Sequence, residues 1–380
     1  MDTMIALVSD QRMQNVIPVL QAGKTYDKLI LVTSKDRQTG KTLPKYIEAA
    51  QDLMAVLKPH LEVELSAESV DPYDIGSVAS TISALINKYS DRDKIVVNMS
   101  GGTKPMAIGA LRAAQQASVP SLYTNTEDHE ILWLSPDSSI TPKPIQIVDF
   151  DVQSYIRVYG EKVTESKKVI DLDATKKTWA ETIGSHHAVI YKKIIGPVTS
   201  AIKDSWKRGT GFPILCTVKP TRRQREVVER LAQQGLWMWD EIANEVSITK
   251  PAASFLHGPW VEVYVAMRMQ QSDCFDDVRL NVKLEGVEGE IDVAAVSNGR
   301  LILVECKSNV QESQQLSKLD SVRRRLGGPY AQAYYARASA AYAKRIREQC
   351  QKYHLNGVFF GAELGSIGEK IGRNIGGITC

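Results

Sequence analysis

Over the first 150 residues, short apolar runs alternate with stretches whose apolar residues have helical spacing. The expected strands are residues 5–9, 29–34, 61–65, 95–99, 122–126 and 131–134. The expected helices are residues 14–22, 43–57, 75–89 and 105–117. Because strands and helices alternate, we expect an α/β domain with a mainly parallel, doubly wound sheet. Ligands bind such sheets beyond the carboxyl ends of their strands.

The rest of the chain shows two further patterns. Residues 151–250 hold polar helical stretches at 155–168 and 177–203, and then a basic helix-like run from Arg222 to Gln234. The alternating segment that follows this run is typical of a β-wing. We therefore expect a mostly helical, winged-helix-like connector whose arginines are either a solvated face or contacts to DNA. Residues 251–380 form the third region, a second α/β domain built around one hairpin.

The hairpin lies between residues 286 and 308. Its two apolar runs are separated by Asn298-Gly299, the strongest short-range signal for a two-residue type I′ turn. This turn fixes the register, so that Asp292 lies opposite Glu305 and both share a face with Lys307. The other positions of both faces are apolar, which predicts a hairpin buried on both sides.

Two directly opposed carboxylates on a buried sheet are destabilising unless a positive charge lies between them. Asp292, Glu305 and the backbone carbonyl of Cys306 offer hard oxygen ligands suited to magnesium or manganese. Lys307 is placed to hold a water or a phosphate oxygen beside such a metal. The alternative is a surface hairpin with an ordinary Glu-x-Lys pair, and the aspartate in register with an apolar strand argues against it.

A glycine-rich turn follows the expected strand 95–99. In Ser100-Gly101-Gly102-Thr103-Lys104 the threonine is suited to cap the next helix and the lysine opens it, so free backbone N–H groups and a cation point at one place. We expect an anion to bind there. The spacing is neither a Walker A loop nor a dinucleotide-binding fingerprint, so it does not indicate ATP hydrolysis or NAD binding. The alternative is a capped turn with a solvated lysine.

Composition narrows the class of protein. The 380 residues are 43% apolar and 24% charged, which suits globular domains with cores of their own. No stretch has the length and apolarity of a transmembrane helix, and the first residues lack the shape of a signal peptide, so we expect a cytoplasmic protein without membrane partners. The five cysteines and six histidines lack the spacing of zinc ligands.

The segment after the hairpin is basic. Residues 309–355 contain nine Lys or Arg and three Asp or Glu, in a chain whose total charge is only +3. Such asymmetry is typical of a nucleic-acid surface. The candidates for phosphate contacts are Arg323, Arg324 and Arg325, and the candidates for stacking on unpaired bases are Tyr330, Tyr334 and Tyr335. The alternative for the tyrosines is packing in the core.

The hairpin EIDVAAVSNGRLILVECKS closely resembles the core of the PD-(D/E)xK nucleases, in which an Asp, a turn and Glu-x-Lys follow one another. This resemblance implies a restriction-endonuclease-like domain with Asp292, Glu305 and Lys307 as catalytic residues. The run Gly258 to Glu262, Gly-x-Trp-x-Glu, resembles the helix that precedes this hairpin in CRISPR-associated nucleases. It implies that Glu262 is a fourth catalytic carboxylate, against the alternative of a solvated helix glutamate.

The strand, Ser-Gly-Gly-Thr-Lys-Pro-Met and helix near residue 100 resemble the signature of CRISPR-associated Rossmann-fold (CARF) domains. This resemblance implies a Rossmann-like domain that binds a cyclic oligoadenylate across a homodimer, with cyclic tetra-adenylate as the commoner activator. The residues expected at this ligand follow the strands: Ser9, Asp10, Thr33, Ser34, Ser100, Gly101, Gly102, Thr103, Lys104 and Met106.

Together, these resemblances imply a type III CRISPR ancillary nuclease of antiviral defence. The expected parts are a CARF domain at 1–150, a connector at 151–250 and a PD-(D/E)xK domain at 251–380. The activity implied is metal-dependent cutting of DNA, RNA or both, with the cyclic nucleotide as allosteric activator. Two alternatives stay open: a CARF-controlled regulator that binds nucleic acid without cutting it, and a ring nuclease that degrades the cyclic oligoadenylate.

Overall fold

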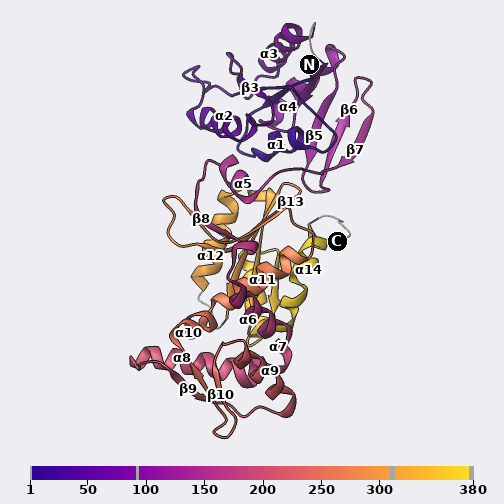
Figure 1. The fold of residues 1–380 in the computed structure, drawn as a ribbon. Helices are drawn as coiled ribbons and strands as arrows, with labels where there is room; N and C mark the ends of the chain where they lie inside the picture. Colours follow the sequence, from indigo (N-terminus) through magenta and orange to yellow (C-terminus); the bar gives the residue numbers. More distant parts are fainter. Residues whose placement is uncertain (1, 91–93, 309–312, 376–380) are drawn as a thin grey trace. The chain divides into compact units, whose positions relative to one another are not determined.

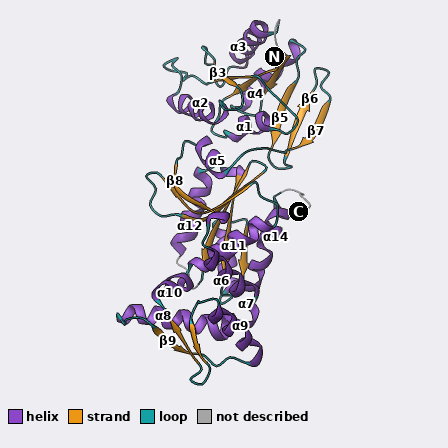
Figure 2. Ribbon diagram, in the orientation of Figure 1, coloured by secondary structure: helices purple, strands orange, loops and turns teal. Residues whose placement is uncertain are grey.

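The computed structural model describes residues 2–90, 94–308 and 313–375. Its contacts divide the chain into two compact units. Unit 1 comprises Met1–Val163, Asn298–Leu301 and Arg324–Ala331, and unit 2 comprises Thr164–Ser297, Ile302–Arg323 and Gln332–Cys380. Figure 1 shows the course of the chain and Figure 2 its helices and strands. Three sheets are present among the described residues, and the α/β class expected from the sequence is confirmed.

Unit 1 is built on a seven-stranded sheet of order β3-β2-β1-β4-β5-β6-β7. Its strands are β1 (Asp2–Leu7), β2 (Lys28–Val32), β3 (Glu62–Leu65), β4 (Lys94–Asn98), β5 (Ser121–Asn125), β6 (Glu130–Leu134) and β7 (Ile140–Pro144). The first five strands in chain order pair in parallel, and β6 and β7 extend the sheet antiparallel. Because β1 and β4 are adjacent and parallel, the loops that follow them lie side by side at one edge of the sheet.

Helices connect the parallel strands of unit 1. They are α1 (Met13–Leu20), α2 (Pro44–Leu57), α3 (Ile75–Tyr89) and α4 (Lys104–Gln116), with α5 (Val152–Val158) after the sheet. Asp74 caps α3 by accepting hydrogen bonds from two backbone N–H groups, and Thr103 caps α4. Gly109 allows α3 and α4 to pack closely, because a Cβ there would lie 2.8 Å from the Ile75 carbonyl oxygen.

The second large sheet has six strands in the order β16-β15-β14-β13-β12-β8. They are β8 (Val163–Lys168), β12 (Asp277–Leu284), β13 (Ile291–Ser297), β14 (Arg300–Lys307), β15 (Ala331–Arg337) and β16 (Gly357–Phe360). One face packs on a large apolar core that includes α11 (Pro259–Gln271) and α14 (Ile367–Asn374). The other face packs on α12 (Ser313–Arg325) and α13 (Ala343–Lys352).

The β13–β14 hairpin forms as the sequence predicts. Asn298 and Gly299 both have positive φ, 45° and 76°, as a type I′ turn requires. Every residue of β13 is buried, and β14 is buried except for partial exposure at Glu305 and Lys307. Glu290, two residues before Asp292, precedes β13 and is exposed.

The segment between β8 and β12 in the chain is mostly helical. Its elements are α6 (Ala174–Ser185), α7 (His187–Ile190), a π-helix (Tyr191–Ile195), α8 (Gly196–Arg208), β9 (Ile214–Thr217), α9 (Arg222–Gln233), β10 (Met238–Asp240), β11 (Glu245–Ile248) and α10 (Lys250–His257). Strands β10, β11 and β9 form a small antiparallel sheet, so the alternating segment is a β-hairpin that follows α9. One helix expected here was wrong: residues 155–168 hold the end of α5 and then β8, which joins the six-stranded sheet as its edge.

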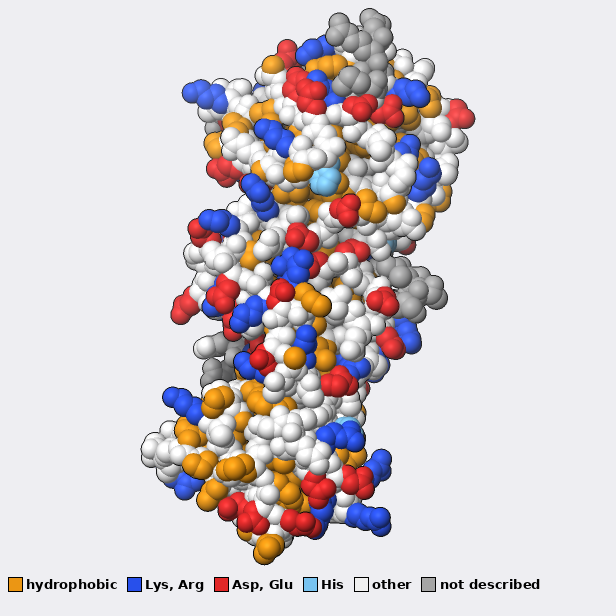
Figure 3. All heavy atoms as spheres, viewed as in Figure 1, with side chains coloured by type: hydrophobic (Ala, Val, Ile, Leu, Met, Phe, Trp, Pro, Cys, Tyr) orange, Lys and Arg blue, Asp and Glu red, His pale blue; other side chains and the backbone are white. Residues whose placement is uncertain are grey.

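Short 3₁₀ turns complete the structure at Val169–Asp171, Gly328–Tyr330 and Gly361–Ser366. Within the described ranges, no helix is both long enough and apolar enough to cross a membrane. Figure 3 shows acidic and basic side chains interspersed over the visible face. A basic stretch of sequence therefore does not by itself identify the surface that binds a polyanion.

Candidate active site and activator site

Two strands and one side chain form the centre of the candidate active site. The side chains of Asp292 on β13 and Glu305 on β14 are 8% and 14% exposed. Lys307 Nζ lies 3.0 Å from Asp292 Oδ2 and 2.6 Å from Glu305 Oε1. The backbone N–H of Cys306 also donates to Asp292 Oδ2, at 2.7 Å. The hairpin therefore brings the three predicted catalytic residues into direct contact, with the ammonium between the carboxylates.

Burial and like charge shape the electrostatics of this group. Burial raises the pKa of Glu305, and the nearby Asp292 carboxylate raises it further, although Lys307 opposes both effects. For Lys307, burial disfavours the ammonium, but attraction from Asp292 and Glu305 outweighs burial and the pKa is raised. The lysine is thus held in its charged form. Its single positive charge does not fully offset the two carboxylates, so the pair still favours a further cation.

Glu262 belongs to the same electrostatic group. It lies in the first turn of α11, and Asn281 Nδ2 donates to its Oε2 at 3.1 Å. Burial, and then repulsion from Asp292, raise the pKa of Glu262 to about 7. Because Glu262 is half-buried and accepts a hydrogen bond from Asn281, the alternative of a solvated helix glutamate is wrong.

The residues fit a divalent cation in their chemistry. The site offers hard donors for Mg²⁺ or Mn²⁺, namely carboxylate oxygens and the backbone carbonyl of Cys306. The raised pKa values of Glu262 and Glu305 indicate an excess of negative charge that such a cation would offset. Among the described residues, no three acidic, histidine or cysteine side chains are already arranged as a metal cluster. Lys307 explains this arrangement, because its ammonium lies between Asp292 and Glu305, where a cation would neutralise both.

The structure contradicts part of the expected nucleic-acid surface. Tyr330, Tyr334 and Tyr335 are 2%, 0% and 0% exposed, so the expectation that they stack on bases is wrong. Arg323 forms an ion pair with Asp320 at 2.7 Å, and both side chains are largely buried. The strand β15 is buried on both faces, which is why its tyrosines are core residues.

Arg324 and Arg325 keep an exposed position, within unit 1. Together with Asp10 and Arg12 they line a hollow of about 330 Å³. Arg325 pairs there with Glu161. The structure thus brings two arginines expected at nucleic acid beside Asp10, a residue expected at the activator.

The glycine-rich turn after β4 begins α4, as the sequence predicts. A Cβ at Gly101 would lie 2.1 Å from the Leu7 carbonyl oxygen and 3.5 Å from Ser9 Oγ, so only glycine lets the loops after β1 and β4 meet. Gly102 has φ +80°, and Lys104 is exposed at the first residue of α4. The Ser9 hydroxyl is buried without a hydrogen-bond partner among the described residues.

Four of the residues expected at the activator lie beneath this turn. They are Thr33, Ser34, Ser100 and Met106, at 2%, 1%, 9% and 0% exposure. Ser34 Oγ donates to Met106 Sδ at 3.3 Å, and Ser100 Oγ donates to Asn98 Oδ1 at 2.6 Å. These side chains are buried in unit 1, and their contact with the ligand stays a prediction.

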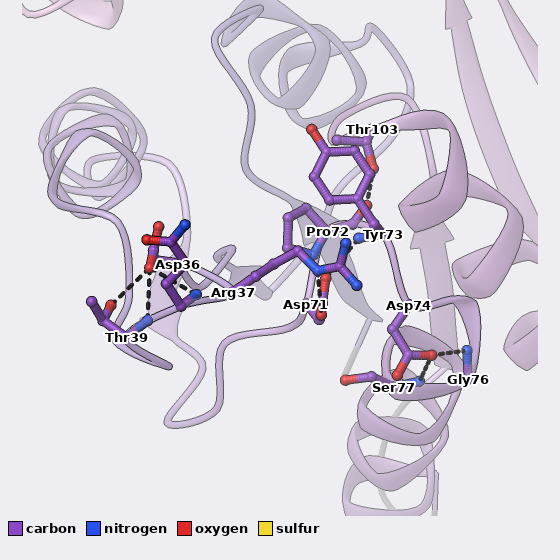
Figure 4. Close-up of polar contacts among 11 residues, drawn as sticks. Asp36, Arg37, Thr39, Asp71, Pro72, Tyr73, Asp74, Gly76, Ser77 and Thr103 are labelled. Atoms are coloured by element: carbon purple, nitrogen blue, oxygen red, sulfur yellow. Dashed lines mark hydrogen bonds and ion pairs between the residues drawn. The ribbon is translucent and has the colours of Figure 1, made fainter.

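Two side chains at this edge, Arg37 and Tyr73, were not predicted from the sequence. Arg37 lies in the loop after β2, and Tyr73 lies in the loop after β3. Figure 4 shows Arg37 reaching Asp71 and lying next to the Tyr73 ring. Arg37 Nε is 3.2 Å from Asp71 Oδ2, and its guanidinium carbon is 5.6 Å from the ring centroid. Thr103 donates to the carbonyl of Pro72, which ties this pair to the glycine-rich turn. An aromatic residue in the polar loop that follows β3 was the available signal.

Two family models match parts of this chain. Residues 3–155 match the model of the Card1 CARF domain, and residues 249–372 match the model of the Card1-like endonuclease domain. No curated protein sequence matches the chain.

Solved structures show the same fold at low identity. Protein VC1899 from Vibrio cholerae is 17% identical with a TM-score of 0.77, and the match covers 99% of both chains. Can2 from Sulfobacillus thermosulfidooxidans, solved in complex with cyclic tetra-adenylate, is 19% identical with a TM-score of 0.74, over 98% of this chain and 97% of Can2. A type III CRISPR defence DNA nuclease activated by cyclic oligoadenylate is 14% identical with a TM-score of 0.55, over 89% of this chain and 45% of that one.

The expected pairing of a sensor and a nuclease is therefore confirmed. With a Card1-type CARF domain at residues 3–155 and a Card1-like endonuclease domain at residues 249–372, the chain belongs to the Card1-like CARF endonucleases.

Proposed function

We propose that the protein is a metal-dependent nuclease that cuts DNA, RNA or both, acting on single strands or by nicking. In this proposal it works as a homodimer in type III CRISPR defence and is activated by cyclic tetra-adenylate. The observation that carries the nuclease activity is the buried pair of Asp292 and Glu305 with Lys307 between them. Such a charge arrangement is costly in a buried sheet and serves no purpose in a non-catalytic regulator.

Asp292, Glu305 and the Cys306 carbonyl would hold the cation. A bound Mg²⁺ or Mn²⁺ supplies a Lewis acid for the phosphate and lowers the pKa of a bound water. Glu262, held by Asn281 in the same electrostatic group, orients water or a further metal ligand. Lys307, released from the carboxylates, is close enough to neutralise a phosphate oxygen of the strand to be cut.

The activator proposal rests on the turn from Ser100 to Lys104. The α4 N-terminus offers backbone N–H groups, and Lys104 adds an exposed cation, which together suit a phosphodiester. A cyclic tetra-adenylate has several phosphates related by symmetry, and two copies of this turn in a homodimer would match them. The Can2 structure, which contains cyclic tetra-adenylate, has the same fold over nearly its whole length and supports this choice of ligand.

One assay tests the whole proposal. Purified protein is incubated with Mn²⁺, labelled single-stranded DNA and RNA, and each cyclic oligoadenylate, and both polymer and activator are analysed for cleavage. We expect polymer cleavage only with cyclic tetra-adenylate, and none from Asp292→Asn. Cleavage of the activator alone would show a ring nuclease, and cleavage of neither would leave a binding regulator. Cleavage that is indifferent to every cyclic oligoadenylate would contradict the sensor's role.

A further inference from the structure

Tyr335 lies beside Glu305 in the six-stranded sheet. The backbone N–H of Ala338 donates to the Lys307 carbonyl at 3.0 Å, and β14 and β15 are neighbours in the sheet. An antiparallel pairing through this bond would place β14 opposite residues beyond the end of β15, so the two strands run parallel. A constant offset of 30 residues then puts position 335 beside position 305, with both side chains on one face.

The surroundings of Tyr335 agree with this offset. Its ring packs on the α12 and α13 side of the sheet with Leu316, Ile346 and Phe360. Tyr334, one position earlier, packs in the large core on the opposite face. Burial raises the pKa of Tyr335, and Lys307 and Glu305 lie close enough to influence that pKa as well.

The hydroxyl of Tyr335 is buried and has no hydrogen-bond partner among the residues that the structure describes. Buried hydroxyl groups are nearly always paired, because an unpaired one loses its hydration without compensation. In the metal-free protein the neighbouring Glu305 carboxylate is already engaged, with Lys307 Nζ at 2.6 Å from its Oε1. The hydroxyl is thus a buried donor with an unused hydrogen bond, on a residue whose neighbour on the same face of the sheet is Glu305.

We propose that Tyr335 is a positioning residue for the metal ligand Glu305. The Tyr335 hydroxyl would donate a hydrogen bond to the Glu305 carboxylate when Glu305 holds a divalent cation in place of Lys307. Carboxylates that bind metals are commonly held in place by such an outer donor, whose loss weakens metal binding about ten- to a hundredfold. This inference rests on the proposed function, in which Asp292 and Glu305 hold the cation.

The test measures Mn²⁺ binding to the full-length protein by titration calorimetry, without nucleic acid. Tyr335→Phe removes only the hydroxyl, and we expect it to weaken Mn²⁺ binding about tenfold or more. Because that hydroxyl is unpaired without metal, we expect the melting temperature in EDTA to stay the same or rise. Tyr334→Phe is the matched control. Its hydroxyl donates to Gln332 Oε1 at 2.6 Å on the other face, so it should leave Mn²⁺ affinity unchanged.

Cleavage supplies a second measurement. In Tyr335→Phe the Mn²⁺ concentration for half-maximal cleavage should rise by the same factor, while the rate at saturating Mn²⁺ stays near that of the wild type. Wild-type Mn²⁺ affinity in Tyr335→Phe, or a lower melting temperature in EDTA, overturns the positioning role. Failure of the metal site itself gives a different result, in which the wild type and Asp292→Asn bind Mn²⁺ equally, and this overturns the proposed function together with the inference.

Discussion

Glu262 offers a test of the electrostatic picture that requires no substrate. Its pKa is raised to about 7 in the folded protein, chiefly by burial and then by Asp292. Glu262→Gln keeps the size of the side chain and its contact with Asn281 but removes the charge. The variant therefore measures what it costs to ionise one carboxyl group at this site in the absence of metal.

The sign and size of the effect follow from linkage. A carboxyl group whose folded pKa is raised stabilises the protein at low pH, and this stability is lost as the pH rises toward 7. With an unfolded value near 4.5, the group contributes about 2.5 kcal/mol at pH 5 and almost nothing at pH 8. We expect the free energy of unfolding of Glu262→Gln, relative to wild type, to increase by about 2.5 kcal/mol from pH 5 to pH 8.

Urea unfolding in EDTA at the two pH values measures this difference. Tryptophan fluorescence is a suitable signal, because five of the six tryptophans lie in unit 2. Glu226→Gln on α9 is the control, since Glu226 is exposed, and it should follow the wild type at both pH values. A Glu262→Gln variant that also follows the wild type would refute the burial and repulsion assigned to this residue.

Three further predictions address the two sites separately. Asp292→Asn should lower the cleavage rate at least about a hundredfold in the assay with labelled DNA and RNA, while calorimetry shows unchanged activator binding. Lys104→Ala should raise the activator concentration for half-maximal cleavage by about a hundredfold to ten-thousandfold, because each protomer loses one charged contact, with the rate at saturation preserved. Gly101→Ala should abolish activator binding, because its Cβ would collide with the Leu7 carbonyl, while circular dichroism shows that the fold is kept. Normal activator affinity in Lys104→Ala would contradict the anion site.

The hairpin was predictable because local chemistry determines it. Asn298-Gly299 selects a two-residue turn, and the turn alone sets which residues face each other. The contact between Asp292 and the Cys306 N–H agrees with that register. The position of the Lys307 ammonium was not predictable, because a long side chain chooses among partners by tertiary electrostatics that a strand pattern does not contain.

The tyrosines on β15 show a different limit of prediction from sequence. A strand buried on both faces has no alternation of apolar and polar residues, so Tyr334 and Tyr335 gave no sign of the face or depth at which they lie. The basic composition around them suggested a surface instead. At the glycine-rich turn, the pattern predicted the loop correctly, but it could not separate exposed Lys104 from buried Met106, two residues later on the same helix.

Under the proposed function, the place of Lys307 between two carboxylates would set a threshold for the ions that can enter. Its ammonium is tethered to the same strand as Glu305, so it competes at an effective concentration far above that of a free ion. A monovalent ion brings no more charge than the ammonium and loses this competition, whereas a divalent ion brings twice the charge. The displaced ammonium then needs a new anion, and a nucleic-acid phosphate is one. Under the proposed function, binding of the ion and binding of the substrate would therefore each favour the other.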